Sequence, residues 1–302
     1  MGRVKLNSYP YLLQIEPICG CNLKCPLCPV GNNTIKRKRG VMSYENYVKI
    51  MKKIEDHIIH ISFWNWGEPL LNKDIFRMIS YAKQKKIHTV LATNGYYVTK
   101  DISRRIIKSG LDEIKISLDG ASRETYERYR KNSDFNKVLE NISYLIKEKN
   151  RMRNKLRVSL QFIVMKHNQH EIGKMKKISK KVNADYLSIK TVSTHGDQKN
   201  FREFIPDKED LSRYHLKKGE AKPIEKKKCY FPWRILVNWE GTVTVCCLDF
   251  NAKYGLGNIL KKDLKPIWNG EGYKKFRRAM LKDRNSIDLC KKCSTSQERF
   301  IE

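Results

Sequence analysis

The segment Tyr11-Leu-Leu-Gln-Ile-Glu-Pro-Ile-Cys-Gly-Cys-Asn-Leu-Lys-Cys-Pro-Leu-Cys28 joins a short apolar run to three closely spaced cysteines. Residues 11–15 predict a buried strand, so the cysteine loop follows the carboxyl end of a strand, where open α/β folds bind ligands. Cys21, Cys25 and Cys28 have C-x3-C-x2-C spacing. A cubane iron–sulfur cluster usually takes four thiolates, and three would leave one iron open to a small chelating molecule.

A structural zinc site is the main alternative for these three cysteines. Zinc usually takes a fourth Cys or His at C-x2-C or H-x3-H spacing, but the nearest histidine in the sequence is His57. The spacing therefore favours a cluster over zinc or inert thiols.

An alternation of apolar strand, polar turn and amphipathic helix continues from residue 11 to about residue 192. Strands are expected at 11–15, 61–64, 89–92, 113–118, 158–164 and 186–190. Helices are expected at 44–55 after Ser43 as N-cap, at 74–85, and at 100–109 before Gly110. Alternating βα units imply a parallel sheet with right-handed crossovers.

The later strands have one apolar and one polar face. In the fourth, Ile114 and Ile116 alternate with Lys115 and Ser117. A sheet buried on both faces would instead consist of continuous apolar runs. We therefore predict an α/β fold, a partial (βα)6 TIM-like barrel around a polar lumen, with a small C-terminal cysteine-rich α+β domain. A closed eight-stranded barrel would have a filled interior.

Two domains joined by a linker are expected along the chain: a barrel at 8–195, the linker at 196–228 and a C-terminal domain at 229–302. Residues 193–228 are polar and lack periodicity, as in a linker or a few short surface helices. Residues 235–245 predict a hairpin that turns at Glu240-Gly241, and a helix is expected near 272–281.

A second set of cysteines lies in the C-terminal domain. Cys229, Cys246, Cys290 and Cys293 would provide four thiolates in the pattern C-x11-G-x4-C followed by C-x2-C. Such a small domain has little core, and a bound metal would stabilise it. Zinc ribbons also use split cysteine pairs, but the spacing favours iron–sulfur. Cys19 and Cys247 are then the spare thiols.

The chain is strongly basic, with 62 Lys and Arg against 32 Asp and Glu and a net charge of +30. Such an excess is typical of nucleic-acid binding. Here it is spread over the whole chain, with compact runs only at Lys36–Arg39 and Lys226–Lys228. A lysine-rich composition explains this equally well, so nucleic acid is not expected as the partner. Anionic cofactors, lipids and phosphorylated metabolites remain open.

The apolar stretches are strand-sized and broken by charge, so no membrane span is expected. Residues 1–20 lack the apolar run and cleavage site of a secretory signal. A cytoplasmic location is therefore expected. In that reducing compartment, nine cysteines in close clusters indicate metal ligation rather than disulfides.

Further motifs follow the second and third expected strands and lie at the end of the fourth. They are Trp66-Gly67-Glu68-Pro69, Thr93-Asn94-Gly95 and Ser117-Leu118-Asp119-Gly120. Together with the cysteine triad, in this order, they resemble the radical S-adenosylmethionine (SAM) superfamily. The C-terminal domain resembles its SPASM/twitch subgroup, in the form that holds one auxiliary cluster.

The resemblance implies two 4Fe-4S clusters and SAM as cofactors. Cys21, Cys25 and Cys28 would hold the first cluster, whose open iron chelates SAM and cleaves it to a 5′-deoxyadenosyl radical. The Gly67-Glu68-Pro69 turn resembles the family's GGE motif, with Trp66 in place of the first glycine. The implied SAM contacts are Gly67, Glu68, Pro69, Asn94, Ser117, Asp119 and Arg130. The implied auxiliary ligands are Cys229, Cys246, Cys290 and Cys293.

The implied function is an enzyme that abstracts a hydrogen from a small-molecule substrate, in an oxidation or epimerisation, with an external electron donor such as flavodoxin or ferredoxin. The sequence shows no separate N-terminal peptide-recognition domain, so peptide or protein side-chain modification is the alternative and RNA modification ranks behind both. A non-enzymatic electron-transfer or zinc-stabilised binding protein is disfavoured, because it would not need an open iron. No catalytic residue is assigned. Gln161, Lys190 and Asp249 are candidates for contact with the substrate or for proton transfer, and simple solvation or salt bridging is the alternative for each.

Overall fold

The computed structural model describes residues 4–193, 201–217, 220–223, 229–291 and 293–294. The chain divides into two compact units. The first consists of the described parts of Met1–Cys21, Asn33–Leu91 and Cys229–Lys291. The second consists of the described parts of Asn22–Asn32, Ala92–Lys228 and Lys292–Glu302.

The first unit is built on a mixed sheet with strand order β13-β12-β11-β1-β4-β5. β1 is parallel to both β4 and β11, whereas β11, β12 and β13 are antiparallel. β2 and β3 form a separate antiparallel pair. The strands are β1 (Leu12–Ile15), β2 (Ile18–Cys19), β3 (Gly40–Val41), β4 (His60–Phe63), β5 (His88–Thr93), β11 (Ile235–Val237), β12 (Thr242–Thr244) and β13 (Gly255–Asn258). The last two residues of β5 belong to the second unit.

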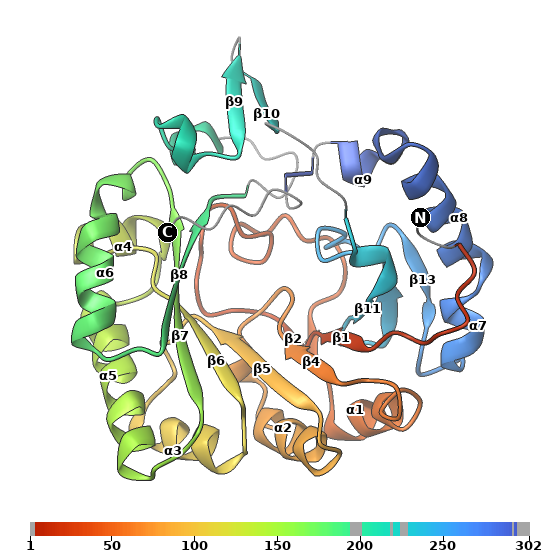
Figure 1. Ribbon diagram of the computed structural model, residues 1–302, viewed down its shortest axis with the longest axis horizontal. Helices are drawn as coiled ribbons and strands as arrows, with labels where there is room; N and C mark the ends of the chain where they lie inside the picture. The colour runs from red at the N-terminus through yellow and green to blue at the C-terminus, as the bar shows by residue number, and fades with distance from the viewer. Residues whose placement is uncertain (1–3, 194–200, 218–219, 224–228, 292, 295–302) are drawn as a thin grey trace. The chain divides into compact units, whose positions relative to one another are not determined.

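The pairing of β1 with β11 brings a strand from the N-terminal part of the chain and a strand from the C-terminal part into one sheet (Figure 1). Leu13 lies opposite Ile235 and Ile15 opposite Val237, and all four side chains are buried. Each such side chain contributes roughly 1.5–3 kcal/mol to stability when it is fully buried. The predicted hairpin at 235–245 is therefore confirmed, but it extends the sheet of β1, which the sequence did not indicate.

The first unit contains the two helices expected at 44–55 and 74–85, but the first of them ends at Met51, four residues before the predicted end. Its helices are α1 (Tyr44–Met51), η1 (Pro69–Leu71), α2 (Ile75–Gln84), η5 (Phe231–Trp233), α7 (Leu264–Trp268), α8 (Glu271–Lys282), η6 (Arg284–Ser286) and α9 (Asp288–Lys291). The Ser43 side chain accepts a hydrogen bond from the Asn46 backbone N–H at 3.2 Å and caps α1. α8 covers the helix expected near 272–281, and α7 and α8 pack against β13.

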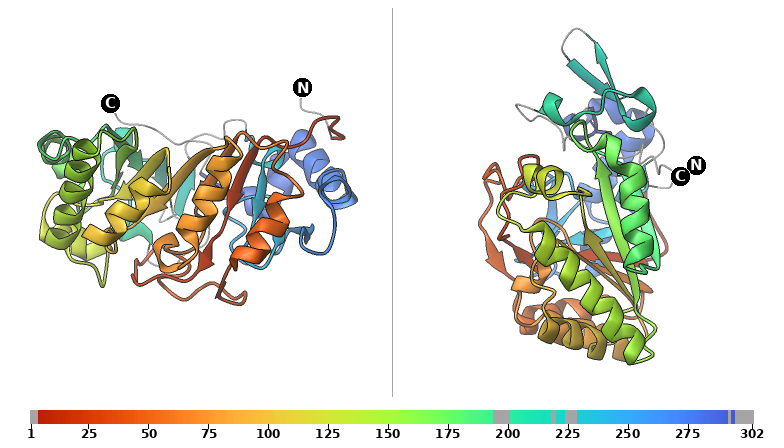
Figure 2. Two further views of the ribbon diagram at one scale, coloured as in Figure 1. Left: turned by 90° about the horizontal axis from the view of Figure 1, so that it is seen from below. Right: turned by 90° about the vertical axis from the view of Figure 1, so that its left-hand side faces the viewer.

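The second unit contains the parallel strands β6 (Glu113–Ser117), β7 (Arg157–Val164) and β8 (Tyr186–Thr191). Its helices are α3 (Lys100–Lys108), α4 (Arg123–Tyr129), α5 (Phe135–Arg151), η2 (Gln169–Glu171), α6 (Ile172–Lys181), η3 (Phe201–Phe204) and η4 (Glu209–Leu211). α6 packs against β7 and β8, and α5 packs against α3 and α4 (Figure 2). β9 (Tyr214–Lys217) and β10 (Glu220–Pro223) form an antiparallel hairpin.

Strand alternation is clearest in β6. Ile114 and Ile116 are fully buried, while Lys115 and Ser117 are partly exposed. The pattern is weaker in β7, where Ser159 is buried as well. The predicted strands 11–15, 61–64, 89–92, 113–118, 158–164 and 186–190 correspond to β1, β4, β5, β6, β7 and β8, with ends that agree to within one residue. The chain therefore has the expected α/β fold.

The segment expected as a linker contains short elements where it is described: η3, η4 and the β9–β10 hairpin. The basic run Lys226–Lys228 lies outside the described residues. The domain limits 8–195, 196–228 and 229–302 stay predictions. Among the described residues, no helix is long and apolar enough to cross a membrane.

Candidate functional site

The cysteine loop of the second unit is held at its start by backbone contacts. The Lys24 N–H donates to the carbonyl of Lys131 at 3.0 Å. Within the loop, the Cys28 N–H donates to the Cys25 carbonyl at 3.1 Å. Cys25 is buried and Cys28 is half-buried. These bonds bring the loop beside the end of α4, where Arg130 caps the helix.

Arg130 connects the loop to β6. Its Nε and Nη2 contact Asp119 Oδ2 at 2.7 and 2.5 Å, and its Nη1 donates to Cys25 Sγ at 3.8 Å. Burial raises the pKa of the Cys25 thiol to about 11, although Arg130 lowers it. Burial alone would lower the pKa of Arg130, but Asp119 raises it well above its ordinary value. A guanidinium that is only partly exposed is therefore aimed at a predicted cluster ligand.

The Asp119 carboxylate binds protein groups through both of its oxygens. Its side chain is 0% exposed, and Oδ1 accepts a hydrogen bond from the Ile163 N–H at 2.8 Å while Oδ2 binds Arg130. In this geometry Asp119 orients Arg130. Its contact with SAM stays a prediction.

Asn94 also holds the cysteine loop. Its Nδ2 donates to Asn22 Oδ1 at 2.9 Å, and its Oδ1 accepts from the Tyr96 N–H at 2.9 Å. Asn141 Nδ2 donates to the carbonyls of Gly95 and Tyr96 and fixes the same turn. The Thr93-Asn94-Gly95 motif therefore supports the loop through the Asn94 side chain, while Asn141 holds the turn itself.

Ser117 lies at the end of β6, opposite Gln161 of β7. Both side chains are partly exposed. Lys190 lies opposite Ile163 in the next strand and is also partly exposed. These three side chains remain predicted contacts for SAM or substrate.

The Gly67-Glu68-Pro69 turn of the first unit packs directly on the residues that precede Cys21. The Glu68 N–H donates to the Gly20 carbonyl at 2.9 Å. A Cβ on Gly67 would lie 2.1 Å from the Ile18 carbonyl oxygen, so only glycine fits. The Glu68 carboxylate is buried and accepts from the Leu70 N–H at 3.1 Å. Pro69 begins η1, whose N-cap is Glu68.

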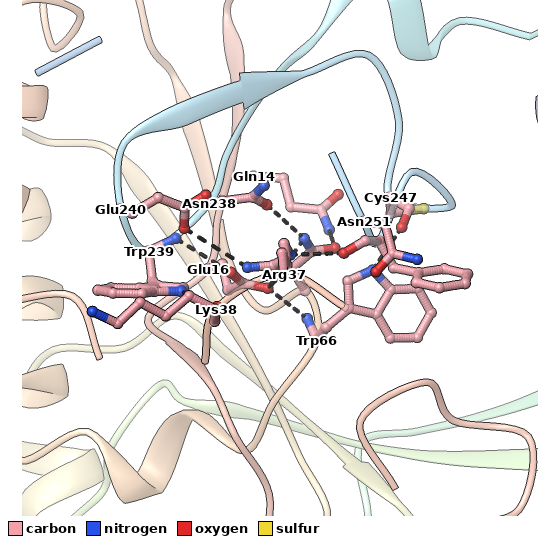
Figure 3. Close-up of polar contacts among 12 residues, drawn as sticks. Gln14, Glu16, Arg37, Lys38, Trp66, Asn238, Trp239, Glu240, Cys247 and Asn251 are labelled. Carbon is pink, nitrogen blue, oxygen red and sulfur yellow. Dashed lines mark hydrogen bonds and ion pairs between the residues drawn. The ribbon is translucent and has the colours of Figure 1, made fainter. Parts of the chain in front are cut away.

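Trp66 links this turn to the C-terminal cysteines (Figure 3). Its indole Nε1 donates to the Cys247 carbonyl at 2.7 Å, and its ring lies edge-on to Phe250 with centroids 5.8 Å apart. Its backbone N–H donates to Glu16 Oε1 at 3.3 Å. The tryptophan that replaces the family's first glycine therefore binds the segment that follows Cys246.

Cys246 and Cys290 belong to one apolar cluster of the first unit. Cys290 is buried with Val245, Phe276 and Ile287, and Cys246 packs against that cluster. The Leu248 N–H donates to Cys246 Sγ at 3.4 Å, and such a bond suits a thiolate. These contacts support the choice of Cys246 rather than Cys247 as a ligand. Cys229 is half-buried and Cys293 is buried.

Asp249 stabilises the turn after the adjacent cysteines. Its carboxylate accepts hydrogen bonds from the N–H groups of Lys253 and Tyr254 at 2.8 and 2.9 Å. Burial raises the pKa of Asp249, and these two N–H groups lower it. The spare thiol of Cys19 is also buried, and burial raises its pKa to about 11.

The chemistry of the donor set fits iron–sulfur clusters. All nine cysteines lie in the described residues and are thiols, which are the ligands that such clusters take. The Arg130 guanidinium beside Cys25 suits a negatively charged group there. No three Cys, His, Asp or Glu side chains of the described residues gather as a metal site, so the ligand sets are assigned from the cysteine spacing.

The sequence interpretation missed several residues that hold these segments. Asn22 lies within the cysteine loop, next to a ligand, and only its contact with Asn94 reveals its role. Glu16 follows an apolar strand and is fully buried, which is unusual for an acid. Arg37 lies in the compact basic run 36–39, which gives no sign in the sequence of a buried ion pair.

Comparisons with known proteins identify both parts of the chain. Residues 15–177 match the model of the radical SAM superfamily. Residues 229–294 match the model of the SPASM iron–sulfur cluster-binding domain.

Relatives with known names are distant. The chain is 28% identical over 182 residues to an AdoMet-dependent heme synthase of Methanosarcina barkeri, a match that covers 60% of this chain and 50% of the synthase. It is 24% identical over 289 residues to a GTP 3′,8-cyclase of Clostridium botulinum, with 85% of this chain and 89% of the cyclase covered.

The fold is similar to that of BtrN in complex with AdoMet and 2-DOIA, with a TM-score of 0.60, 20% identity, and 98% of this chain and 100% of that chain covered. Native anSMEcpe with bound AdoMet gives a TM-score of 0.70 at 20% identity, with 93% and 88% covered. The chain belongs to the radical SAM superfamily: it is a radical SAM enzyme with a C-terminal SPASM domain, and its cofactors are SAM and 4Fe-4S clusters.

Proposed function

We propose that this enzyme abstracts a hydrogen atom from a small-molecule substrate and completes an oxidation or an epimerisation. When bound, the cluster and SAM supply the 5′-deoxyadenosyl radical that such a reaction needs. The observation that carries the proposal is the buried Cys25 thiol within the C-x3-C-x2-C loop, which accepts a hydrogen bond from Arg130.

The residues around this loop position it. Cys21, Cys25 and Cys28 would hold the first cluster. Asp119 keeps the Arg130 guanidinium charged and directed at Cys25 Sγ. A fixed cation beside a thiolate ligand favours the negative charge of the ligand and restricts its orientation.

The SAM-binding part of the proposal concerns two motifs. The backbone carbonyls of Gly67-Glu68-Pro69 would accept the methionyl ammonium, and the contacts with Ile18 and Gly20 hold that turn in place. Ser117, at the carboxyl end of β6, would bind a polar group of SAM. Asn94 would act on SAM through its support of the cysteine loop.

The auxiliary cluster would be held by Cys229, Cys246, Cys290 and Cys293. The common apolar cluster of Cys246 and Cys290 supports the pairing of these two thiols. An external donor such as flavodoxin or ferredoxin would supply the electron. A cytoplasmic location forms part of the proposal, because thiolate ligands require a reducing compartment.

The small-molecule substrate class is supported by the relatives. The GTP 3′,8-cyclase, named for a nucleotide substrate, aligns with 85% of this chain. BtrN, which covers 98% of this chain, was solved with 2-DOIA.

Peptide modification is the second candidate. Streptococcus suis SuiB bound to its precursor peptide SuiA gives a TM-score of 0.69 at 17% identity, with 96% of this chain and 71% of that chain covered. Native anSMEcpe was also solved with a bound peptide, and it gives a TM-score of 0.66.

One assay separates the two candidates. A cell extract is separated by ultrafiltration into small and large molecules. Each fraction is incubated anaerobically with reduced enzyme and SAM, and the 5′-deoxyadenosine formed is quantified. We expect the small-molecule fraction to raise its formation above the substrate-free rate, with or without protease treatment. Stimulation by the large-molecule fraction alone, lost after protease treatment, would assign the enzyme to peptides. Stimulation lost after ribonuclease treatment would assign it to RNA.

A further inference from the structure

A fully buried carboxylate lies directly after β1. Glu16 is 0% exposed, and Arg37 Nη2 donates to its Oε1 at 2.5 Å. The same Oε1 accepts from the Trp66 N–H at 3.3 Å, and Oε2 accepts from the Trp239 N–H at 3.2 Å. Burial raises the pKa of Glu16, while Arg37 and the two N–H groups lower it. One side chain thus binds three segments of the first unit (Figure 3).

Arg37 extends this contact to the loop that follows the adjacent cysteines. Its Nε donates to the Phe250 carbonyl at 2.7 Å. The neighbouring Lys36 N–H donates to Asn251 Oδ1 at 2.6 Å. Glu240 is a peripheral partner, because its Oε2 lies 3.7 Å from Arg37 Nη1 and its side chain is 33% exposed. Arg37 therefore bridges Glu16 and the 246–251 loop with two different nitrogens.

Trp239 contacts the segment 36–40 through its indole ring. Its indole Nε1 donates to the Lys38 carbonyl at 3.2 Å. Its ring fills the space where a Cβ of residue 40 would stand, since a Cβ on Gly40 would lie 2.4 Å from a ring carbon. The segment 36–40 is thus held between Glu16 and the β11–β12 turn and is not an open basic patch.

We propose that Glu16 and Arg37 are positioning residues that join the auxiliary cysteine loop, residues 246–251, to the Trp66-Gly67-Glu68-Pro69 turn. Through this pair, a well-ordered 246–251 loop keeps the 66–69 turn in the conformation that binds SAM, so disorder of the loop weakens SAM binding. The inference rests on the proposed roles of Cys246 and of residues 67–69. It adds that the two sites are energetically linked.

The geometry explains why an ion pair is suited to this task. An apolar pair of equal volume would be about as stable in a buried position. It would not bind two backbone N–H groups and a carbonyl in defined directions, as Glu16 and Arg37 do. The pair therefore fixes orientation. Loss of the partners that orient metal ligands typically costs about 10- to 100-fold in metal affinity or activity, and we expect a loss of SAM affinity at the lower end of that range.

A double-mutant cycle tests the linkage. Arg37→Lys keeps the charge but replaces the planar fork, whose Nη2 and Nε bind Glu16 and Phe250 separately, by a single ammonium on a flexible stem. Cys229→Ala/Cys290→Ala removes two predicted auxiliary ligands. The SAM dissociation constant is measured by equilibrium dialysis on anaerobically reconstituted protein, and iron is counted in each sample. We expect each change alone to weaken SAM binding about tenfold, and the combined protein to be no weaker than either.

Controls separate this linkage from a general loss of stability. Lys38→Ala removes an exposed charge from the same basic run, and Glu240→Gln removes the peripheral partner; both should bind SAM as the parent does. If Arg37→Lys does not fold, Glu16→Gln replaces it in the cycle, since it keeps the shape of the side chain and places an amide against the N–H of Trp239.

The outcomes are distinct. SAM affinity that is unchanged in Arg37→Lys, or effects that multiply in the combined protein, would overturn the linkage. Full iron content in Cys229→Ala/Cys290→Ala would instead show that the auxiliary ligands of the proposed function were wrongly assigned.

Discussion

Replacement of Gly67 by alanine is the most direct test of the SAM-binding turn. The added Cβ would lie 2.1 Å from the Ile18 carbonyl oxygen and 2.9 Å from that of Gly20. Both atoms belong to the backbone, so no side-chain rotation relieves the contact. The turn, or the segment that precedes Cys21, must move instead.

The size of the movement follows from these distances. Real Cβ contacts are essentially never shorter than 3.0 Å, so the 2.1 Å contact requires a shift of roughly 1 Å. A misplacement of about 1 Å in a substrate-positioning element can cost on the order of 100-fold. We therefore expect Gly67→Ala to bind SAM about 100-fold more weakly and to form 5′-deoxyadenosine correspondingly slowly at low SAM.

Gly173→Ala provides the matched control. Gly173 lies in α6, is exposed, and has nothing within 4 Å of an added Cβ. Alanine there should leave SAM binding unchanged and stabilise the protein by about 0.5–1 kcal/mol, because glycine is a poor helix former. SAM binding is measured by equilibrium dialysis and folding by urea denaturation. A folded Gly67→Ala protein that binds SAM as tightly as the parent would refute the placement of SAM against this turn.

Three further outcomes are expected. Asp119→Asn should lower the free energy of unfolding by about 3 kcal/mol in urea denaturation, because it leaves the Arg130 charge buried without its carboxylate partner; a loss below about 1 kcal/mol would contradict a buried ion pair. Cys246→Ala should lose auxiliary iron, whereas Cys247→Ala should keep it, because Cys246 shares an apolar cluster with Cys290 and the substitution leaves the Cys247 carbonyl that binds Trp66 in place; the reverse order would show that the other thiol is the ligand. RNA binding measured by filter retention should be weak and should fall by about three orders of magnitude or more between roughly 50 and 200 mM salt; a salt-resistant, sequence-specific complex would favour an RNA substrate.

Much of the α/β fold could be predicted because its strands and caps are local signals. Apolar alternation located β6, and Ser43 marked the start of α1. The pairing of β1 with β11 could not be predicted, since it joins residues 222 positions apart, Leu13 and Ile235, and no local pattern encodes that contact.

In the candidate site, the potential cluster ligands could be predicted from the sequence, but the side chains that orient them could not. Cysteine spacing identifies potential ligands because cluster geometry restricts how thiolates are arranged along the chain. The side chains that orient them depend on tertiary contacts. The contact of Asp119 with SAM stays a prediction, whereas its hydrogen bonds to Arg130 and Ile163 could not be predicted from its motif. Arg37 stood out in the sequence only as part of a compact basic run, and its bond to the buried Glu16 carboxylate could not be predicted from that run.

The assignment of the cysteine loop as the site of SAM cleavage can be tested by comparing the parent protein with Cys25→Ala. Both proteins are reconstituted anaerobically, reduced with dithionite and incubated with SAM, and 5′-deoxyadenosine and methionine are quantified. We expect the parent to form the two products in equal amounts and Cys25→Ala to form neither, because the loop then lacks a predicted cluster ligand, the thiol to which Arg130 donates. Formation of both products by Cys25→Ala at the rate of the parent would contradict the assignment of Cys25 as a cluster ligand.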